Sequence, residues 1–452
     1  MSKVGILITT AIASFLMTFI GSSVNIALPA ISKDFSINAV LLSWIVTSYF
    51  LAGAIFLVPF GKIADIYGRK KVFFYGVLIY TLSSLFSALS PSAIVLIWFR
   101  IFQGIGSAMI SGTSVAILTS VFPIGERGKA LGINVSAVYL GLTLGPILGG
   151  LLTQHFGWRS IFLLNVPLGL TIIILILWKL KEEWAEAKEE KFDFIGSIIY
   201  GVSLISIMYG FSVLPSAKGI LLVLTGIITT SCFVWWEIKT ENPILDLKLF
   251  KNNSVFLFSN LSALIAYSST FSVIFLLSLY LQYIKSLSPQ QAGLILASQP
   301  IVMTIFSPFA GKLSDKIEPR IIASIGMGFA TLSLFSFTFL SKNTNLSFVI
   351  FNLVLLGLGL AFFSSPNTNA VMSSVERRFY GVASALRGTM RLLGQTFSMG
   401  IAMLIFAIYI GKSKITPKYY PLLLTSMKVA FVVFTGLCFS GIIFSLIKTK
   451  SS

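Results

Sequence analysis

The residues of this sequence that could carry chemistry are few, because most of the chain is apolar. Three arginines, Arg100, Arg387 and Arg391, lie inside long apolar segments. Placing a charged side chain in an apolar environment costs free energy, so its presence there indicates a functional role. For Arg100, the alternative is that the side chain extends to the edge of its segment. For Arg387 and Arg391, which lie four residues apart on one helix face, the alternative is pairing with backbone carbonyls.

The carboxylates lie at or near the ends of the apolar segments instead of their middles. These acidic residues are Asp65, Glu126, Asp193, Glu237, Asp246, Asp315 and Glu376. The only histidine, His155, also lies at a segment end, where a packing or interfacial role is favoured over a proton relay. The buried charge is therefore positive. It predicts a cavity that disfavours multivalent cations and suits neutral, zwitterionic or anionic amphiphiles.

The motifs, the cysteines and the charge pattern of the sequence exclude several classes of protein. No nucleophile–base pair, metal-ligand spacing or phosphate-binding loop is present, so we expect no enzyme, no metal site and no cofactor. The two cysteines lie in apolar runs, which excludes a disulfide scaffold. The net charge of +18 comes from basic residues in short gaps between apolar runs, a pattern that does not indicate a nucleic-acid partner.

Membrane-spanning helices must position these residues. Of the 452 residues, 56% are hydrophobic and 11% are charged, too few charges to cover the surface of a soluble protein. Apolar runs of about twenty residues predict about fourteen transmembrane helices in an all-α polytopic membrane protein. The runs lie at about 5–28, 41–60, 72–90, 93–119, 130–153, 160–178, 194–214, 217–237, 254–281, 291–310, 321–340, 346–370, 384–410 and 425–447.

The lysines and arginines predict the orientation of the chain. With the N-terminus inside, most of them fall in cytoplasmic loops, so both termini are expected in the cytoplasm. The most highly charged run, residues 181–190, is expected to form a solvated cytoplasmic helix, with a regulatory surface as the alternative.

A short internal repeat suggests two related halves. The sequence Gly-Lys-Ile-Ala-Asp at 61–65 recurs as Gly-Lys-Leu-Ser-Asp at 311–315, each copy at the end of an apolar run. Transporters are commonly built from two such halves, with the substrate site between them. The expected layout is a six-helix bundle at 1–178, cytoplasmic linkers and an accessory two-helix hairpin at 179–253, and a second six-helix bundle at 254–452.

The loop at 61–71, Gly-Lys-Ile-Ala-Asp-Ile-Tyr-Gly-Arg-Lys-Lys, resembles the signature Gly-x-Leu-Ala-Asp-x-x-Gly-Arg-Lys of the major facilitator superfamily. Gly61 and Gly68 allow a tight turn. Asp65 can accept hydrogen bonds from a neighbouring helix N-terminus. In the family that helix is the eleventh core span, which would begin near Gly381, and Arg69 would add an ion pair. The resemblance implies a latch between the halves, and the alternative is a basic loop that serves only topology.

The segment at 141–150, Gly-Leu-Thr-Leu-Gly-Pro-Ile-Leu-Gly-Gly, is similar to the antiporter motif Gly-x-x-x-Gly-Pro-x-x-Gly-Gly of the same superfamily. Its small residues allow close helix approach, and its proline bends the helix. We expect a smooth surface at which the halves seal and part, with plain helix packing as the alternative. The motif residues are Gly141, Gly145, Pro146, Gly149 and Gly150.

Other segments are similar to the fourteen-span drug:proton antiporter branch of that superfamily. They are Asn25–Pro29, Trp158–Pro167, Arg387–Gly394, and Arg100 with Gln103 and Gly104. The branch usually carries an aspartate in the first span, five residues before the asparagine of Asn-x-Ala-Leu-Pro, where this chain has Ile20. The missing aspartate favours a transporter of the same fold without proton coupling.

Polar residues inside the spans complete the candidate site. From them, and from the arginines, we expect substrate or proton handling by Arg100, Gln103, Asn25, Tyr139, Gln299, Asn367, Arg387 and Arg391. The alternative for each polar residue is an interhelical hydrogen bond.

The resemblance implies an exporter of small amphipathic compounds, of the multidrug type. It would work as a monomer by proton antiport and alternating access in a prokaryotic cytoplasmic membrane. The alternative within the same fold is an uncoupled or differently coupled facilitator, or a lipid or metabolite exporter. A membrane sensor or enzyme on the same scaffold is a third hypothesis, without a supporting motif.

Overall fold

The computed structural model describes residues 3–185, 190–241, 243–245, 250, 253–375, 380–411 and 413–446. Regular structure in these ranges is helical, apart from one isolated β-bridge between Asn38 and Lys414. Side chains cap several helices. Ser92, for example, accepts a hydrogen bond from the backbone of Val95 at the start of the fourth helix.

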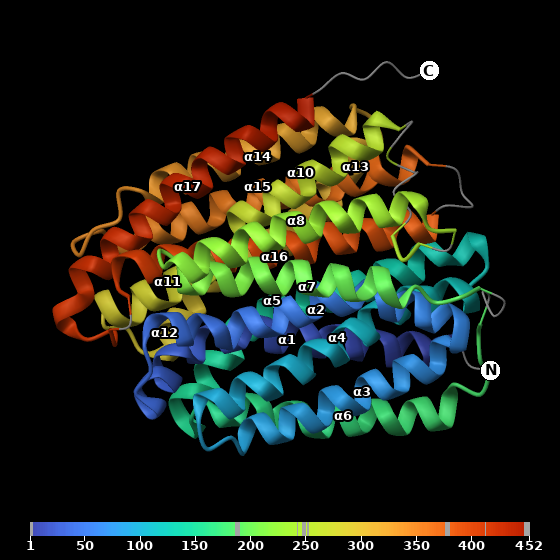
Figure 1. Cartoon of the computed structure of the whole chain (residues 1–452), viewed down its shortest axis with the longest axis horizontal. Coiled ribbons are helices and arrows are strands. Elements are labelled where there is room, and N and C mark those ends of the chain that lie inside the picture. The colour runs from blue at the N-terminus through green and yellow to red at the C-terminus, as the bar shows by residue number, and fades with distance from the viewer. Residues whose placement is uncertain are drawn as a thin grey trace.

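The first six helices form the N-terminal bundle (Figure 1). They are α1 (Lys3–Phe35), α2 (Ala39–Tyr67), α3 (Arg69–Ala88), α4 (Ala93–Val121), α5 (Ile124–Phe156) and α6 (Arg159–Lys179).

An accessory hairpin follows, formed by α7 (Phe194–Val213) and α8 (Ala217–Lys239). Helix α7 packs on α2 of the N-terminal bundle and on α16 of the C-terminal bundle. The Tyr200 hydroxyl of α7 donates a hydrogen bond to the carbonyl of Ala54 in α2, at 3.1 Å. The hairpin therefore contacts both bundles, as its place between them in Figure 1 shows.

The C-terminal bundle contains two spans that are each made of more than one element. The first joins α10 and α11 to a π-helical turn, and the second joins α12 to α13. Its helices are α10 (Ser254–Thr270), α11 (Val273–Leu279), α12 (Pro289–Leu296), α13 (Ser298–Ser314), α14 (Pro319–Phe337), α15 (Leu346–Ser373), α16 (Tyr380–Tyr409) and α17 (Tyr420–Leu446), with the turn at Tyr280–Ile284.

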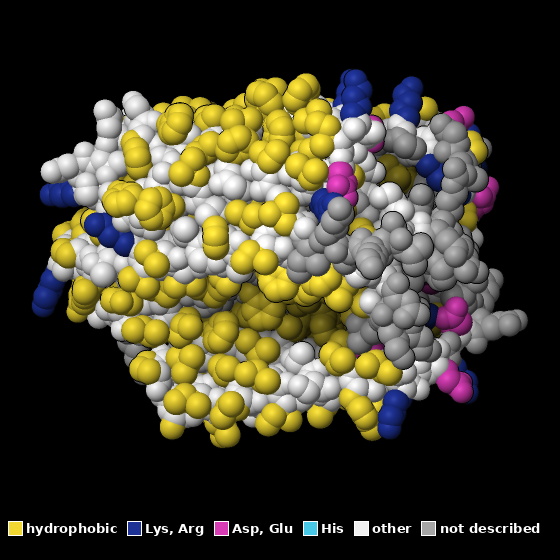
Figure 2. All heavy atoms as spheres, turned by 90° about the horizontal axis from the view of Figure 1, so that it is seen from above, with side chains coloured by type: hydrophobic (Ala, Val, Ile, Leu, Met, Phe, Trp, Pro, Cys, Tyr) yellow, Lys and Arg dark blue, Asp and Glu magenta, His cyan; other side chains and the backbone are white. Residues whose placement is uncertain are grey.

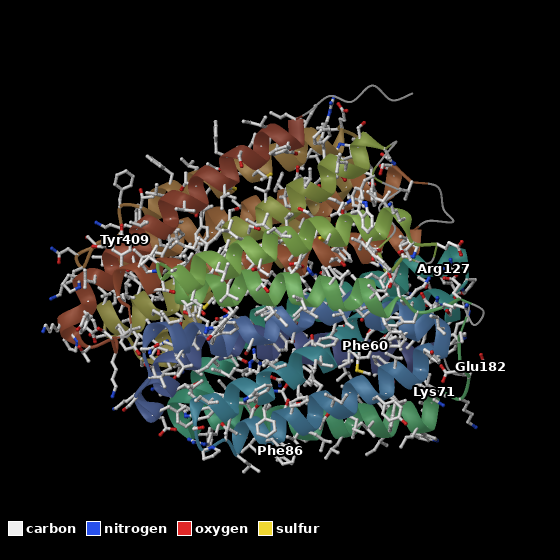
Figure 3. All side chains as sticks on the ribbon, viewed as in Figure 1. Phe60, Lys71, Phe86, Arg127, Glu182 and Tyr409 are labelled. Carbon is white, nitrogen blue, oxygen red and sulfur yellow. The ribbon has the colours of Figure 1, made fainter. Side chains whose placement is uncertain are left out.

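The start of α1 and the end of α17 lie at the same end of the molecule, as Figure 1 shows. We call this end, where α1 begins and α17 ends, the terminal face, and the opposite end the far face. In Figure 3, Lys71, Arg127 and Glu182 lie at the terminal face, while Tyr409 lies toward the far face.

The expected membrane spans are confirmed. Within the described residues, 14 helical stretches are long and apolar enough to cross a bilayer. Figure 2 shows hydrophobic side chains over the middle of the molecule and most charged side chains toward its two ends. The chain is thus an all-α polytopic membrane protein. The exact domain boundaries at 178 and 253 stay a prediction.

Candidate functional site

The loop between α2 and α3 is a tight turn closed by an ion pair. Gly68 has a φ of +121°, a conformation that glycine adopts more readily than other residues. Arg69 Nη2 lies 2.8 Å from Asp65 Oδ1, and Arg69 Nη1 donates to Ser120 Oγ of α4 at 2.7 Å. These two contacts lie within the N-terminal bundle. The latch with α16 stays a prediction, because Glu376 and the rest of 376–379 lie outside the described residues.

The expectation that Gly61 belongs to the tight turn is wrong, because Gly61 lies inside α2 and the helix continues to Tyr67. Gly61 is also not a close-packing glycine. A Cβ added at Gly61 would meet no atom within 4 Å. Its equivalent in the repeat, Gly311, lies close to Ser365 of α15, and the following Asp315 accepts from Asn369 Nδ2 at 3.2 Å. The two copies therefore end equivalent helices, α2 and α13, with different side-chain partners.

The segment after α6 docks on the α2–α3 loop. Residues 180–185, which we call the linker, are not helical, so the expected helix over 181–190 is wrong for its first half. The backbone N–H of Arg69 donates to the carbonyl of Trp184, and that of Lys70 donates to Glu183 Oε1, both at 2.8 Å. The Glu183 carboxylate thus caps the first turn of α3, where the helix dipole favours negative charge. Residues 186–189 lie outside the described residues.

The glycine-rich motif of α5 has two faces, and only one meets the other bundle. For a Cβ at Gly141, Gly145 or Gly149, the nearest atoms belong to α1. For a Cβ at Gly150, they belong to Pro289 and Gln290 of α12. Pro146 is likewise the nearest neighbour of Gly293 in α12. The expected surface between the halves is therefore Pro146 and Gly150, while the other three glycines allow α1 and α5 to pack closely.

Hydrogen bonds join the two bundles near the far face. Ser278 Oγ donates to the carbonyl of Asn25 at 2.6 Å, and Gln282 Nε2 donates to the carbonyl of Ile26 at 2.9 Å. Gln290 also contacts Gln154 and His155 at the end of α5. Together with Pro146 and Gly150, these contacts close the far face between the bundles.

Arg100 is fully buried inside the N-terminal bundle, so the alternative of extension to the segment edge is wrong. Its Nε donates to the carbonyl of Ile45 at 3.0 Å, and its Nη1 donates to Gln103 Oε1 at 2.5 Å. Gln103 in turn donates to Ser84 Oγ at 2.7 Å. The guanidinium also lies over the ring of Tyr49, 4.2 Å from its centre, a favourable cation–π geometry.

A second cationic group lies where α16 faces the N-terminal bundle. Arg387 Nη1 donates to Thr368 Oγ1 of α15 at 2.8 Å. Arg391, Tyr267 and Tyr139 are all close enough to Arg387 to interact with it electrostatically. Because Tyr139 belongs to α5 and the other residues to the C-terminal bundle, this group spans the junction of the two halves.

The remaining predicted site residues belong to neither cationic group. The side chain of Asn25 donates to the carbonyl of Gly21 in its own helix, and Gln299 contacts Met303 in its own helix. Asn367 is buried, with 4% of its surface exposed. The structure thus brings together Arg100 with Gln103, and Tyr139 with Arg387 and Arg391.

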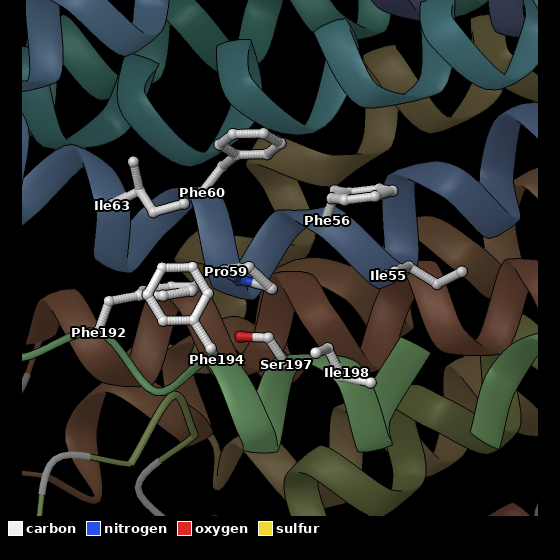
Figure 4. Close-up of a pocket in the computed structure, with 9 residues that line it drawn as sticks. All are labelled: Ile55, Phe56, Pro59, Phe60, Ile63, Phe192, Phe194, Ser197 and Ile198. Atoms are coloured by element: carbon white, nitrogen blue, oxygen red, sulfur yellow. The ribbon is translucent and has the colours of Figure 1, made fainter. Parts of the chain in front are cut away.

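An apolar pocket lies between α2 and the start of α7 (Figure 4). Its volume is about 210 Å³. Two of its side chains, Phe194 and Ile198, are exposed on a membrane-spanning helix, so the pocket lies at the lipid boundary. Because its lining is almost entirely hydrocarbon, it suits an apolar chain and not a polar solute. The lining residues are Ile55, Phe56, Pro59, Phe60, Ile63, Phe192, Phe194, Ser197 and Ile198.

The sequence analysis did not predict the hydroxyl groups near the second cationic group. Ser364 and Thr368 lie one turn apart on α15, and Ser364 lies 3.3 Å from the Tyr267 hydroxyl. Ser307 of α13 contacts the Tyr139 hydroxyl at 3.5 Å. The available signal was the four-residue spacing of Ser364 and Thr368, which matches that of Arg387 and Arg391.

A helical membrane protein with two bundles joined near one face, and with polar groups at their junction, has the architecture of a secondary transporter. The family model described as "Major Facilitator Superfamily" matches residues 10–399 and, in a second match, 259–451. The chain belongs to the major facilitator superfamily of membrane transporters.

Two curated relatives are similar over most of the chain. The riboflavin transporter RibZ of Clostridioides difficile (strain 630) is 31% identical over 443 residues, which cover 98% of this chain and 96% of the relative. The multidrug resistance protein Stp of Mycobacterium tuberculosis (strain CDC 1551 / Oshkosh) is 31% identical over 411 residues, 90% of this chain and 76% of the relative.

Solved structures share the fold. A bacterial homologue of the human lysosomal transporter Spinster, in an inward-facing and unoccupied conformation, has a TM-score of 0.70 at 16% identity, with 98% of this chain and 96% of that chain covered. The peptide transporter POT in complex with sulfate has a TM-score of 0.71 at 14% identity, with 96% of this chain and 94% of that chain covered.

Proposed function

We propose that this transporter exports small amphipathic compounds by alternating access, as a multidrug-type proton antiporter. The observation that carries the proposal is the seam between the bundles near the far face. Pro146 and Gly150 pack there against α12, and few hydrogen bonds hold the seam closed. Small residues allow a dry, close contact that separates without leaving large side chains unpartnered. The multidrug resistance relatives support the export of drug-like compounds.

In this proposal the terminal face is cytoplasmic, in the inner membrane of a prokaryote, and the protein functions as a monomer. Asp65 and Arg69 gate the cytoplasmic side, with Gly68 in the turn and Gly61 inside α2. The structure then corresponds to a state closed on the outer side. Arg100 and Gln103, and the residues at the bundle junction, handle substrate or protons.

A second candidate is a transporter of the same fold without proton coupling, which carries a metabolite or a lipid. Two observations favour it. Ile20 stands where the branch usually has an aspartate, and the riboflavin transporter is similar over nearly the whole chain.

Transport measured in inside-out vesicles separates the two candidates. The purified protein is reconstituted, and uptake of a neutral fluorescent drug and of riboflavin is followed with and without an imposed pH gradient. The antiport proposal predicts drug uptake that rises with an acidic vesicle interior and stops when an ionophore removes the gradient. Uptake that does not depend on the pH gradient contradicts antiport and supports the second candidate.

A further inference from the structure

Arg387 and Arg391 carry two positive charges one helical turn apart, with no counter-charge among the described residues. Within the described residues, neither arginine forms an ion pair. The ion pairs that are found there lie near the terminal face or the far face. Like charges at this spacing repel each other, and the partial burial of both side chains strengthens the repulsion. An arrangement of this kind is stabilised when an anion binds between the two groups.

Hydrogen-bond donors are left available around these arginines. Arg391 Nε is buried and has no hydrogen-bond partner within the described residues. Of the Arg387 donors, Nη1 bonds to the Thr368 hydroxyl. Hydroxyl groups of Ser364 and Tyr267 are nearby, 3.3 Å from each other. These groups are donors or can act as donors, as oxyanion recognition requires.

The planar guanidinium group binds oxyanions through two parallel hydrogen bonds, a geometry that matches carboxylate and phosphate. We propose that Arg387 and Arg391 bind the oxyanion group, carboxylate or phosphate, of the solute that the protein carries. The proposal rests on the transport function proposed above and names organic anions as a substrate class alongside neutral amphiphiles.

The position of the arginines supports a site for cargo. The hydroxyl of Tyr139, in the N-terminal bundle, contacts Ser307 of the C-terminal bundle at 3.5 Å, and Tyr139 is close enough to Arg387 to interact with it electrostatically. An anion held at this junction touches both halves. A change in how the halves pack therefore changes the donors around it, as alternating access requires.

The test measures binding without transport. Melting temperatures of the purified full chain in detergent are compared with benzoate and with benzamide, a neutral probe of the same shape, at equal ionic strength. We expect benzoate to raise the melting temperature by several degrees and benzamide to leave it unchanged. Equal shifts with the two probes, or no shift with either, overturn the proposal.

Variants then locate the site. Arg387→Gln and Arg391→Gln should each lose at least half of the benzoate shift, and Arg387→Lys, which keeps the charge but not the fork, should lose less. Lys316→Gln, which removes an exposed cation from the same bundle, should keep the full shift. Size-exclusion chromatography checks that each variant is folded. A benzoate shift that persists in both glutamine variants overturns the proposal.

A lipid phosphate is the other source of the same chemistry. The assay is repeated with phosphatidylglycerol and with phosphatidylcholine micelles. If the site serves solutes, the benzoate shift remains with both lipids. If phosphatidylglycerol alone abolishes it, the solute assignment is overturned in favour of a lipid headgroup. Uptake of a neutral drug by the same variants tests the transport function separately. Failure of the proposed anion site can therefore be distinguished from failure of the proposed transport function.

Discussion

Among single residues, Arg100 shows that burying a charge costs free energy of desolvation. Arg100 has no exposed surface, and its described partners are a carbonyl, an amide and an aromatic ring, none of them an anion. A buried charge without an ionic partner contributes little stability, and an apolar residue of similar size often replaces such a group without loss. The retained charge therefore points to function.

Arg100→Met tests this reading. Because methionine fills a similar volume without a charge to desolvate, we expect the stability to stay within about 2 kcal/mol of the natural protein. Transport should fall at least tenfold, since Gln103 and Tyr49 lose the group that orients them. Thermal unfolding and vesicle uptake provide the two readings. A stable variant with full transport would show that the charge is dispensable.

Two glycines of α5 allow alanine substitution to be compared at a tightly packed position and at an open one. A Cβ at Gly145 would overlap Ser22 of α1, whereas a Cβ at Gly132 would meet no atom within 4 Å. We expect Gly145→Ala to destabilise the protein by about 1–3 kcal/mol because the helices must separate. Gly132→Ala should stabilise it by about 0.5–1 kcal/mol, because alanine is the better helix former. Equal melting temperatures for the two variants would contradict close packing of α1 and α5.

At the scale of elements, the linker connects the accessory hairpin to the loop that the proposal assigns to gating. Glu183 and Trp184 bond to the first residues of α3, and Lys62 pairs with Glu190 just before α7. Movement of α2 relative to α7 therefore acts on the Lys62–Glu190 pair.

Glu183→Gln tests the linker contact. The amide still reaches the backbone of Lys70 but loses the charge that interacts with the α3 dipole, an interaction of about 0.3–1 kcal/mol. We expect a small loss of stability and faster tryptic cleavage after Lys181, the exposed lysine of the linker. Glu182→Gln, which changes a neighbouring exposed carboxylate, is the control. Identical cleavage rates for the two variants would show that Glu183 does not hold the linker.

The sequence predicted the elements better than their partners. Runs of about twenty apolar residues identify spans because a bilayer demands that length, and the positions of Asp65 and Arg100 follow from those runs. Contacts between distant segments leave no such pattern. The linker on the α2–α3 loop, the orientation of Gly141 and Gly149 toward α1, and the hydroxyls around Arg387 all depend on how the helices pack.

For the whole molecule, transport by alternating access requires the two bundles to separate at the far face during each cycle. Near that face the end of α5 meets the start of α12, where the backbone N–H of Gln290 donates to Gln154 Oε1 at 3.3 Å. A covalent bond at this place should hold the structure in the closed arrangement described here.

The most direct measurement is therefore cross-linking of Gln154→Cys with Gln290→Cys, in a background where the exposed Cys232 is replaced by serine. We expect oxidation to stop vesicle transport of a neutral drug and a reductant to restore it, while each single cysteine variant remains active. Undiminished transport with the cross-link complete, as verified by mass spectrometry, would contradict the claim that the far face must open.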